Sequence, residues 1–143
     1  MFRLMALAAI LLFAQSVAAQ QGPNTSRQAA DTAGYRAKAM AFLTQDGADA
    51  KDSGSNRKVF LDLVDLNGDG IPEALARIES SEDCGSRGCT AYILDLKGPN
   101  ARSIGDFTAH TLAPLSSKTG PWTDVSLNGV KMVFRAGKYE TSR

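Results

Sequence analysis

Histidine, cysteine, aromatic residues and an excess of either charge are all scarce in this sequence of 143 residues. Its 16 Lys and Arg side chains are nearly matched by 15 Asp and Glu, which leaves a net charge of +1. Nucleic acids and anionic membrane surfaces select proteins with a basic excess, so neither is expected as a partner. Aromatic residues make up only 7% of the chain, and the core must therefore rest on Leu, Ile, Val and Ala.

The single histidine, His110, limits the catalytic schemes that are open to this chain. Imidazole-assisted catalysis needs a nucleophile and an orienting acid, yet no G-x-S-x-G elbow surrounds the nearby Ser103 or Ser116. We therefore expect no enzymatic activity and interpret His110 as a half-exposed strand residue. An enzyme with an unrecognised site is the alternative.

The first 19 residues have the layout of a secretory signal peptide. Arg3 precedes an apolar run from Leu4 to Ala14, and Val17-Ala18-Ala19 supplies small residues for cleavage. The run is shorter than the ~20 residues that span a bilayer, which disfavours a membrane anchor. We expect cleavage after residue 19, no membrane insertion afterwards, and a location in the periplasm or outside the cell.

The chain beyond that segment divides into residues 20–57, a helix with a polar linker, and residues 58–143, a β-rich domain. The alanine-rich stretch after Thr25 or Ser26, either of which can cap a helix, has helical periodicity. Its spaced apolar residues are Ala33, Ala37, Met40, Ala41 and Leu43. Residues 44–58 are polar and without periodicity, as in a loop.

Strand signals dominate the chain after this linker. The segments KVFLDLV and TAYILDL are apolar and β-prone, and Asn128-Gly129 between VSL and VKMVF predicts a two-residue hairpin. Residues 98–100 and 136–138 predict further turns. The expected fold class is α+β: an N-terminal helix followed by a mainly antiparallel sheet of about six strands.

The two cysteines lie in the segment CGSRGC. An exported chain meets an oxidising compartment, so a Cys84–Cys89 disulfide is expected, and it would stabilise the fold by roughly 2 kcal/mol. A redox-active pair usually has two intervening residues and a positive neighbour. Here four residues intervene, although Arg87 is one of them, and the structural bridge is favoured.

The segment DLNGDGIPE crowds oxygen-bearing side chains between apolar flanks. Aligned to a calcium-loop template, Gly70 falls at the sharp turn and the residue 71 carbonyl points inward. The candidate calcium ligands are Asp65, Asn67, Asp69, Ile71 and Glu73. The alternative is a solvated turn, since N-G and D-G are hairpin signals in their own right. We expect Ca²⁺ to be bound weakly, at about 10⁻⁴ to 10⁻³ M, as in other extracellular modules.

The loop departs from a complete EF-hand at two positions. Ala76 stands where the bidentate glutamate would be, and Pro72 lacks the N–H that pairs one loop with another. Residues 73–79 alternate like a strand, but they could also begin a helix at Pro72, and the sequence leaves this choice open.

Residues 60–78 resemble the calcium loop of FG-GAP and related integrin-type propeller repeats, in which the acid at position 9 is the last ligand. Glu73 stands in that position. Over residues 58–140, the chain resembles a group of small exported proteobacterial proteins in which one such loop precedes a C-G-x-x-G-C hairpin. The matching residues are Cys84, Gly85, Gly88, Cys89, Trp122, Asp124, Gly137 and Tyr139. Propeller repeats come in sevens and this loop occurs once, so the propeller fold is not implied.

These observations predict an exported calcium-binding protein without catalytic activity, which acts as a binding or accessory protein. The alternative is a periplasmic inhibitor or immunity protein that blocks a hydrolase, such as a cell-wall-degrading enzyme. A protein partner is possible in either case, and its identity does not follow from the residues.

Overall fold

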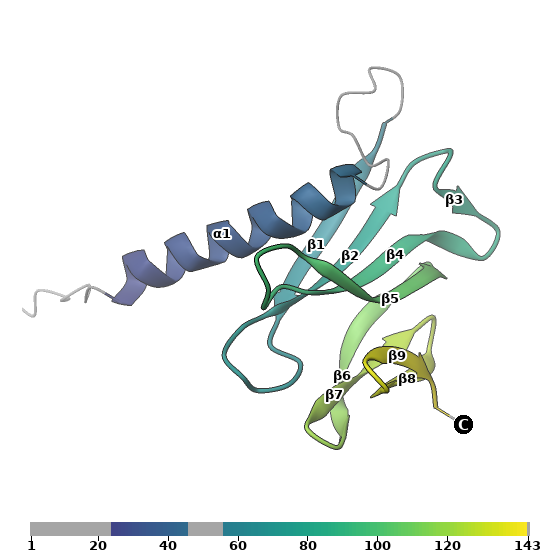
Figure 1. The fold of residues 1–143 in the computed structure, drawn as a ribbon. Helices are drawn as coiled ribbons and strands as arrows, with labels where there is room; N and C mark the ends of the chain where they lie inside the picture. Colours follow the sequence, from purple (N-terminus) through teal and green to yellow (C-terminus); the bar gives the residue numbers. More distant parts are fainter. Residues whose placement is uncertain (1–23, 46–55, 143) are drawn as a thin grey trace, which may run out of the picture.

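A computed structural model describes residues 24–45 and 56–142, which form one helix and nine strands. Helix α1 (Asn24–Gln45) lies on one face of the first sheet, and the second sheet covers part of the other face (Figure 1). The predicted signal peptide and residues 46–55 of the predicted linker lie outside the described residues. No helix in the described part of the chain is both long and apolar enough to cross a membrane.

Sheet A contains five antiparallel strands. Strand β2 pairs with β1 on one edge and β4 on the other, while β4 also pairs with β5 and, at its first residues, with the short β3. These strands are β1 (Lys58–Val64), β2 (Glu73–Glu79), β3 (Cys84–Gly85), β4 (Gly88–Asp95) and β5 (Arg102–Ala109).

Sheet B is a meander in which each of four strands pairs with the next along the chain. Its strands are β6 (Leu112–Thr119), β7 (Trp122–Leu127), β8 (Val130–Arg135) and β9 (Lys138–Thr141). Asn128, with a φ of 52°, and Gly129 form the two-residue turn that was predicted between β7 and β8. The α+β class is confirmed, but residues 56–142 form nine strands in two sheets where one sheet of about six strands was expected.

Strand β2 is the central element because both of its faces are packed. Ala74, Ala76 and Ile78 face the cluster beneath α1, whereas Leu75 faces the cluster between the two sheets. Residues 73–79, for which the sequence allowed a strand or the start of a helix, therefore form a strand. The alternating side chains of this strand point to opposite faces of the sheet, so both faces bury apolar surface.

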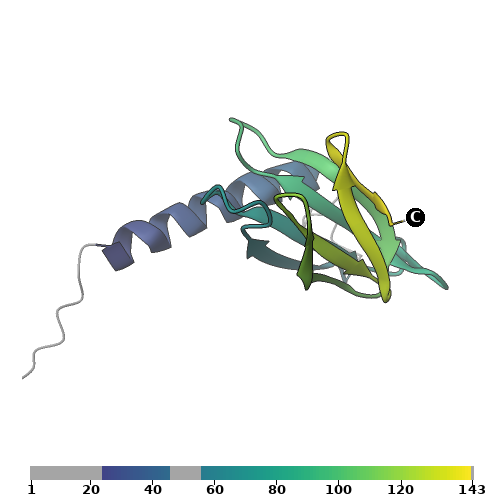
Figure 2. The ribbon, with the colours of Figure 1, turned by 90° about the horizontal axis from the view of Figure 1, so that it is seen from below.

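The helix packs through its C-terminal half only, and Figure 2 shows the N-terminal part extending beyond the sheets. Ala39 and Leu43 are fully buried, and Met40 packs against the same cluster. Leu43 and Met40 are among the spaced apolar residues noted in the sequence, whereas Ala39 is not. Ala33, Ala37 and Ala41, which share the helical spacing noted in the sequence, are exposed and do not form the face that packs on the sheet.

Two basic side chains set the rotation of the helix. Arg36 donates a hydrogen bond of 3.1 Å to the Leu61 carbonyl of β1, and Lys38 donates bonds of 2.7 Å to the carbonyls of Leu96 and Gly98. These contacts join the helix to the middle of the edge strand β1 and to the segment that follows β4. They turn the Ala39 and Leu43 face, rather than the alanine face, toward the core.

A bidentate ion pair links the residue before β1 to the β2–β3 connection. Arg57 donates hydrogen bonds of 2.8 and 3.0 Å to the two carboxylate oxygens of Asp83, and both side chains are about 15% exposed. The bond from Arg57 is the main reason that the pKa of Asp83 lies below its ordinary value.

We expect Asp83→Asn to lower the free energy of unfolding by about 1–3 kcal/mol near neutral pH, the range for losing a hydrogen-bonded charge partner. Because the folded pKa is depressed, this stabilisation is present above the ordinary value of about 3.9 and disappears as pH falls through the folded pKa. Urea unfolding at neutral pH and again below the folded pKa measures the difference. Glu82→Gln, an exposed neighbour, is the control; an equal loss in both variants would contradict the assignment.

Candidate metal centre

The acidic loop, residues 65–72, connects β1 to β2 at one end of sheet A. Val64 pairs with Glu73, so the loop begins and ends at neighbouring positions. Gly70 has a φ of 84°, in the left-handed region that favours glycine, and turns the chain back toward β2. The β4–β5 connection reaches the same end of the sheet, because β4 runs antiparallel to β2.

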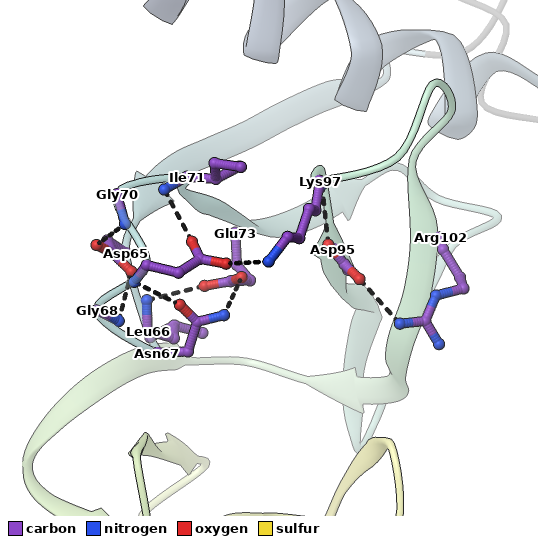
Figure 3. Close-up of polar contacts among 11 residues, drawn as sticks. Asp65, Leu66, Asn67, Gly68, Gly70, Ile71, Glu73, Asp95, Lys97 and Arg102 are labelled. Carbon is purple, nitrogen blue, oxygen red and sulfur yellow. Dashed lines mark hydrogen bonds and ion pairs between the residues drawn. The ribbon is translucent and has the colours of Figure 1, made fainter.

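Side chains in the first half of the loop accept hydrogen bonds from its backbone. The two oxygens of Asp65 accept bonds of 2.7 Å from the Gly68 N–H and 2.9 Å from the Gly70 N–H. Asn67 Oδ1 accepts one of 2.8 Å from the Asp69 N–H. Figure 3 shows these side chains turned inward over the loop. The loop is thus a compact turn in which its own N–H groups hold the side-chain oxygens.

Lys97, in the β4–β5 connection, reaches this loop, and Arg102 at the start of β5 pairs with Asp95 at the end of β4. Asp69 accepts a hydrogen bond of 2.9 Å from the Ile71 N–H and forms an ion pair of 3.0 Å with Lys97; in that order, these hold its pKa below the ordinary value. Arg102 pairs with Asp95 at 2.8 Å (Figure 3). Burial acts to raise the pKa of Asp95, but bonds from the Lys97 N–H and Arg102 together lower it.

Glu73 is the buried member of the site, with only 2% of its surface exposed. Its Oε2 accepts a hydrogen bond of 2.8 Å from the Leu66 N–H. Burial raises its pKa to about 7 despite this bond, and the carboxylates of Asp69, Asp65 and Asp95 add to the rise. The charged form of Glu73 is therefore costly unless further positive charge is present.

Leu66 anchors the loop, and the sequence analysis missed it. Its side chain is fully buried between the two sheets, and its carbonyl accepts a hydrogen bond of 2.6 Å from the Thr123 N–H of β7. The sequence did contain a signal for its burial, because Leu66 is a single apolar residue between Asp65 and Asn67. Because Leu66 also binds Glu73 through its N–H, one residue fixes the loop to both sheets.

The acidic loop holds four of the five predicted ligands, Asp65, Asn67, Asp69 and Ile71, and Glu73 follows it as the first residue of β2. Their side chains do not surround one point. Within residues 24–45 and 56–142, no three acidic, histidine or cysteine side chains gather closely enough to hold a metal ion. Instead, the Lys97 ammonium lies against Asp69. The donor chemistry suits calcium, since carboxylate and amide oxygens are the ligands that this ion prefers. The arrangement would need Lys97 to withdraw.

The other candidate residues lie away from this loop. Cys84 and Cys89 are joined by the predicted disulfide, which closes the β3–β4 turn. His110 was predicted to lie in a strand, but it follows the end of β5 at Ala109 and is exposed in the turn before β6. The prediction failed because the backbone N–H groups of His110 and Thr111 bond to the side chain of Asn128, which is distant in sequence, and not to a neighbouring strand.

Comparison with protein-family models, with curated proteins and with solved structures gives no match to this chain. The functional interpretation therefore rests on the geometry of the site and on the chemistry of its side chains.

We expect Leu66→Ala to lower the free energy of unfolding by about 2–5 kcal/mol, the range for truncating a buried leucine. The control is Val130→Ala, because Val130 is 49% exposed and its truncation should change stability by no more than about 0.5 kcal/mol. Urea unfolding measures both variants. If both changes are equally small, Leu66 does not anchor the loop.

Proposed function

We propose that this chain is an exported, non-catalytic binding or accessory protein whose fold is stabilised by a calcium ion at the acidic loop. The observation that carries the proposal is the proximity of Asp65 and Asp69, in the acidic loop, to the buried Glu73 at the first residue of β2. Like charges this close destabilise one another, and a divalent cation relieves the repulsion.

Asp65, Asn67, Asp69 and Glu73 would hold the ion through side-chain oxygens, and Ile71 through its carbonyl. The ion would neutralise these groups and fix the connection between β1 and β2, which is a structural role. No step of catalysis is involved. The resemblance of residues 60–78 to FG-GAP loops supports the same ligand set, with Glu73 as the last member.

Lys97 is an internal cation that competes for the same oxygens in this proposal. Its ammonium lies 3.0 Å from Asp69, on a side chain that is 65% exposed and able to swing into solvent. In the absence of calcium it partly neutralises the loop. When calcium is abundant, the divalent ion displaces it.

The disulfide supports export, because such bonds persist in oxidising compartments. The amino-terminal sequence expected to act as a signal peptide points the same way. Inhibition of a hydrolase is one role that a protein of this kind can fill. A stable complex that abolishes the activity of the hydrolase would establish that role.

Calcium should raise the melting temperature of the wild-type protein by a few °C relative to chelator. A ligand at about ten times its Kd adds about 1.4 kcal/mol of stability by mass action, which corresponds to that shift for a domain of this size. Asp65→Asn and Asp69→Asn should each abolish the rise. Asp62→Asn, an exposed carboxylate on β1 outside the loop, should keep it. Identical melting of the wild-type protein in chelator and in millimolar calcium would exclude the site.

Lys97→Gln should bind calcium several-fold more tightly than the wild-type protein, because the competing ammonium is removed from Asp69. Isothermal titration calorimetry measures the change in Kd. Lys58→Gln, at the opposite end of β1, alters the net charge equally and should leave Kd nearly unchanged. An unchanged or weaker affinity in Lys97→Gln would show that Lys97 does not compete with the ion.

A further inference from the structure

Three turns from both sheets meet at the end of the molecule opposite the acidic loop (Figure 1). They are the β3–β4 turn, residues 86–87, the β5–β6 turn, residues 110–111, and the β7–β8 turn, residues 128–129. We name these residues the turn cluster. The antiparallel pairing of the strands brings the turns to this one end, although Arg87 in the first turn and Asn128 in the last are 41 residues apart in sequence.

Asn128 joins the turn cluster through its side chain and backbone. Its Oδ1 accepts hydrogen bonds of 2.7 Å from the His110 N–H and 3.0 Å from the Thr111 N–H. Its own N–H donates to the Thr111 carbonyl at 3.0 Å, and its Nδ2 lies 3.5 Å from the Arg87 carbonyl. One residue thereby links all three turns, and their backbones are held before any ligand arrives.

Gly88 brings the β3–β4 turn into direct contact with β5. A Cβ built on Gly88 would lie 2.3 Å from the carbonyl carbon of Ala109 and 2.6 Å from the His110 nitrogen, so no larger residue fits. The Cys84–Cys89 disulfide closes the same turn. His110 Nε2 also lies 3.3 Å from the Ser86 carbonyl. The position of the turn that carries Arg87 is therefore fixed by covalent, steric and polar contacts.

A surface hollow of about 770 Å³ lies among these turns and is lined by Arg87, Thr108, His110, Thr111 and Asn128. The lining groups are a guanidinium, two hydroxyls, an imidazole and an amide, and none of them is acidic. The Asn128 amide and the His110 ring already contact the carbonyls of Arg87 and Ser86. The guanidinium of Arg87 and the two threonine hydroxyls can donate hydrogen bonds to negatively charged oxygen atoms.

Arg87 differs from the other arginine near this hollow, Arg77, because it forms no ion pair with an acid in the part of the chain that the structure describes. Arg77 pairs with Glu79 at 2.9 Å, donates to the His110 carbonyl and lies 4.9 Å from the ring of Phe60. The ion pairs among the described residues do not include Arg87. Arg87 thus places a guanidinium without an acidic partner among the described residues on a fixed turn. The planar guanidinium binds carboxylate and phosphate groups through two N–H donors at once.

We propose that the hollow at the turn cluster binds an oxyanion, a carboxylate or phosphate group of a ligand, between Arg87 and the hydroxyls of Thr108 and Thr111. Arg87 supplies the charge and two parallel N–H donors, and the threonines orient the remaining oxygens. The rigid backbone lowers the ordering cost of binding. This site is separate from the acidic loop and does not depend on calcium.

The test is a titration of isotope-labelled, disulfide-bonded protein with inorganic phosphate and, separately, with acetate, at constant ionic strength. The amide signals of residues 86–88, 108–111 and 128–129 should shift and saturate. The anion that binds more tightly identifies a tetrahedral or a planar group as the natural target. Absence of saturable shifts with both anions would overturn the proposal.

Two variants of Arg87 sharpen this test. Arg87→Gln should weaken binding by about tenfold or more, and Arg87→Lys should weaken it less, because the charge remains and the fork is lost. Arg135→Gln, an exposed arginine on β8 whose nearest acid oxygen is 3.9 Å away, should bind like the wild-type protein. Equal weakening in Arg87→Gln and Arg135→Gln would indicate general charge screening and overturn the site. Asp65→Asn should leave anion binding intact, so failure of the calcium proposal would not affect this result.

Discussion

The rest of the structure depends on the burial of strand β2 on both faces, with a carboxylate at its first residue. Ala74 and Ala76 pack beneath α1 and Leu75 packs between the sheets, so β2 cannot shift without opening both cores. Glu73 must therefore lie where it does, almost fully buried and among other acids. The Leu66 N–H donates a hydrogen bond to this buried carboxyl group, and Lys97 pairs with its acidic neighbour Asp69.

The two ends of sheet A carry different charged groups. At one end, carboxylates outnumber the cations Lys97 and Arg102 that reach them. At the other end, the turn cluster presents Arg87 without an acidic partner among the described residues. The two proposed sites, for a cation and for an anion, therefore lie at opposite ends of sheet A in a chain with a net charge of +1.

Local signals in the sequence were sufficient for part of the fold. KVFLDLV was predicted as a strand and is β1, the Asn128-Gly129 hairpin lies between β7 and β8, and the Cys84–Cys89 bridge is confirmed. Each depends on residues within a few positions of one another. The calcium ligands stay a prediction.

The features that were missed are non-local. The second sheet, the exposed face of the alanine-rich helix, and the approach of Lys97 to Asp69 all depend on pairing between distant segments. Leu66 was missed because burial of a loop residue follows from the sheet that covers it, and hydrophobic periodicity does not report this.

The most direct measurement is a crystal structure of the disulfide-bonded protein grown with calcium, with anomalous scattering used to locate the ion. The account predicts one ion held by oxygens of Asp65, Asn67, Asp69 and Glu73, with the Lys97 ammonium withdrawn from the loop. A loop that keeps Lys97 on Asp69 under saturating calcium, with no anomalous peak beside it, would contradict the account.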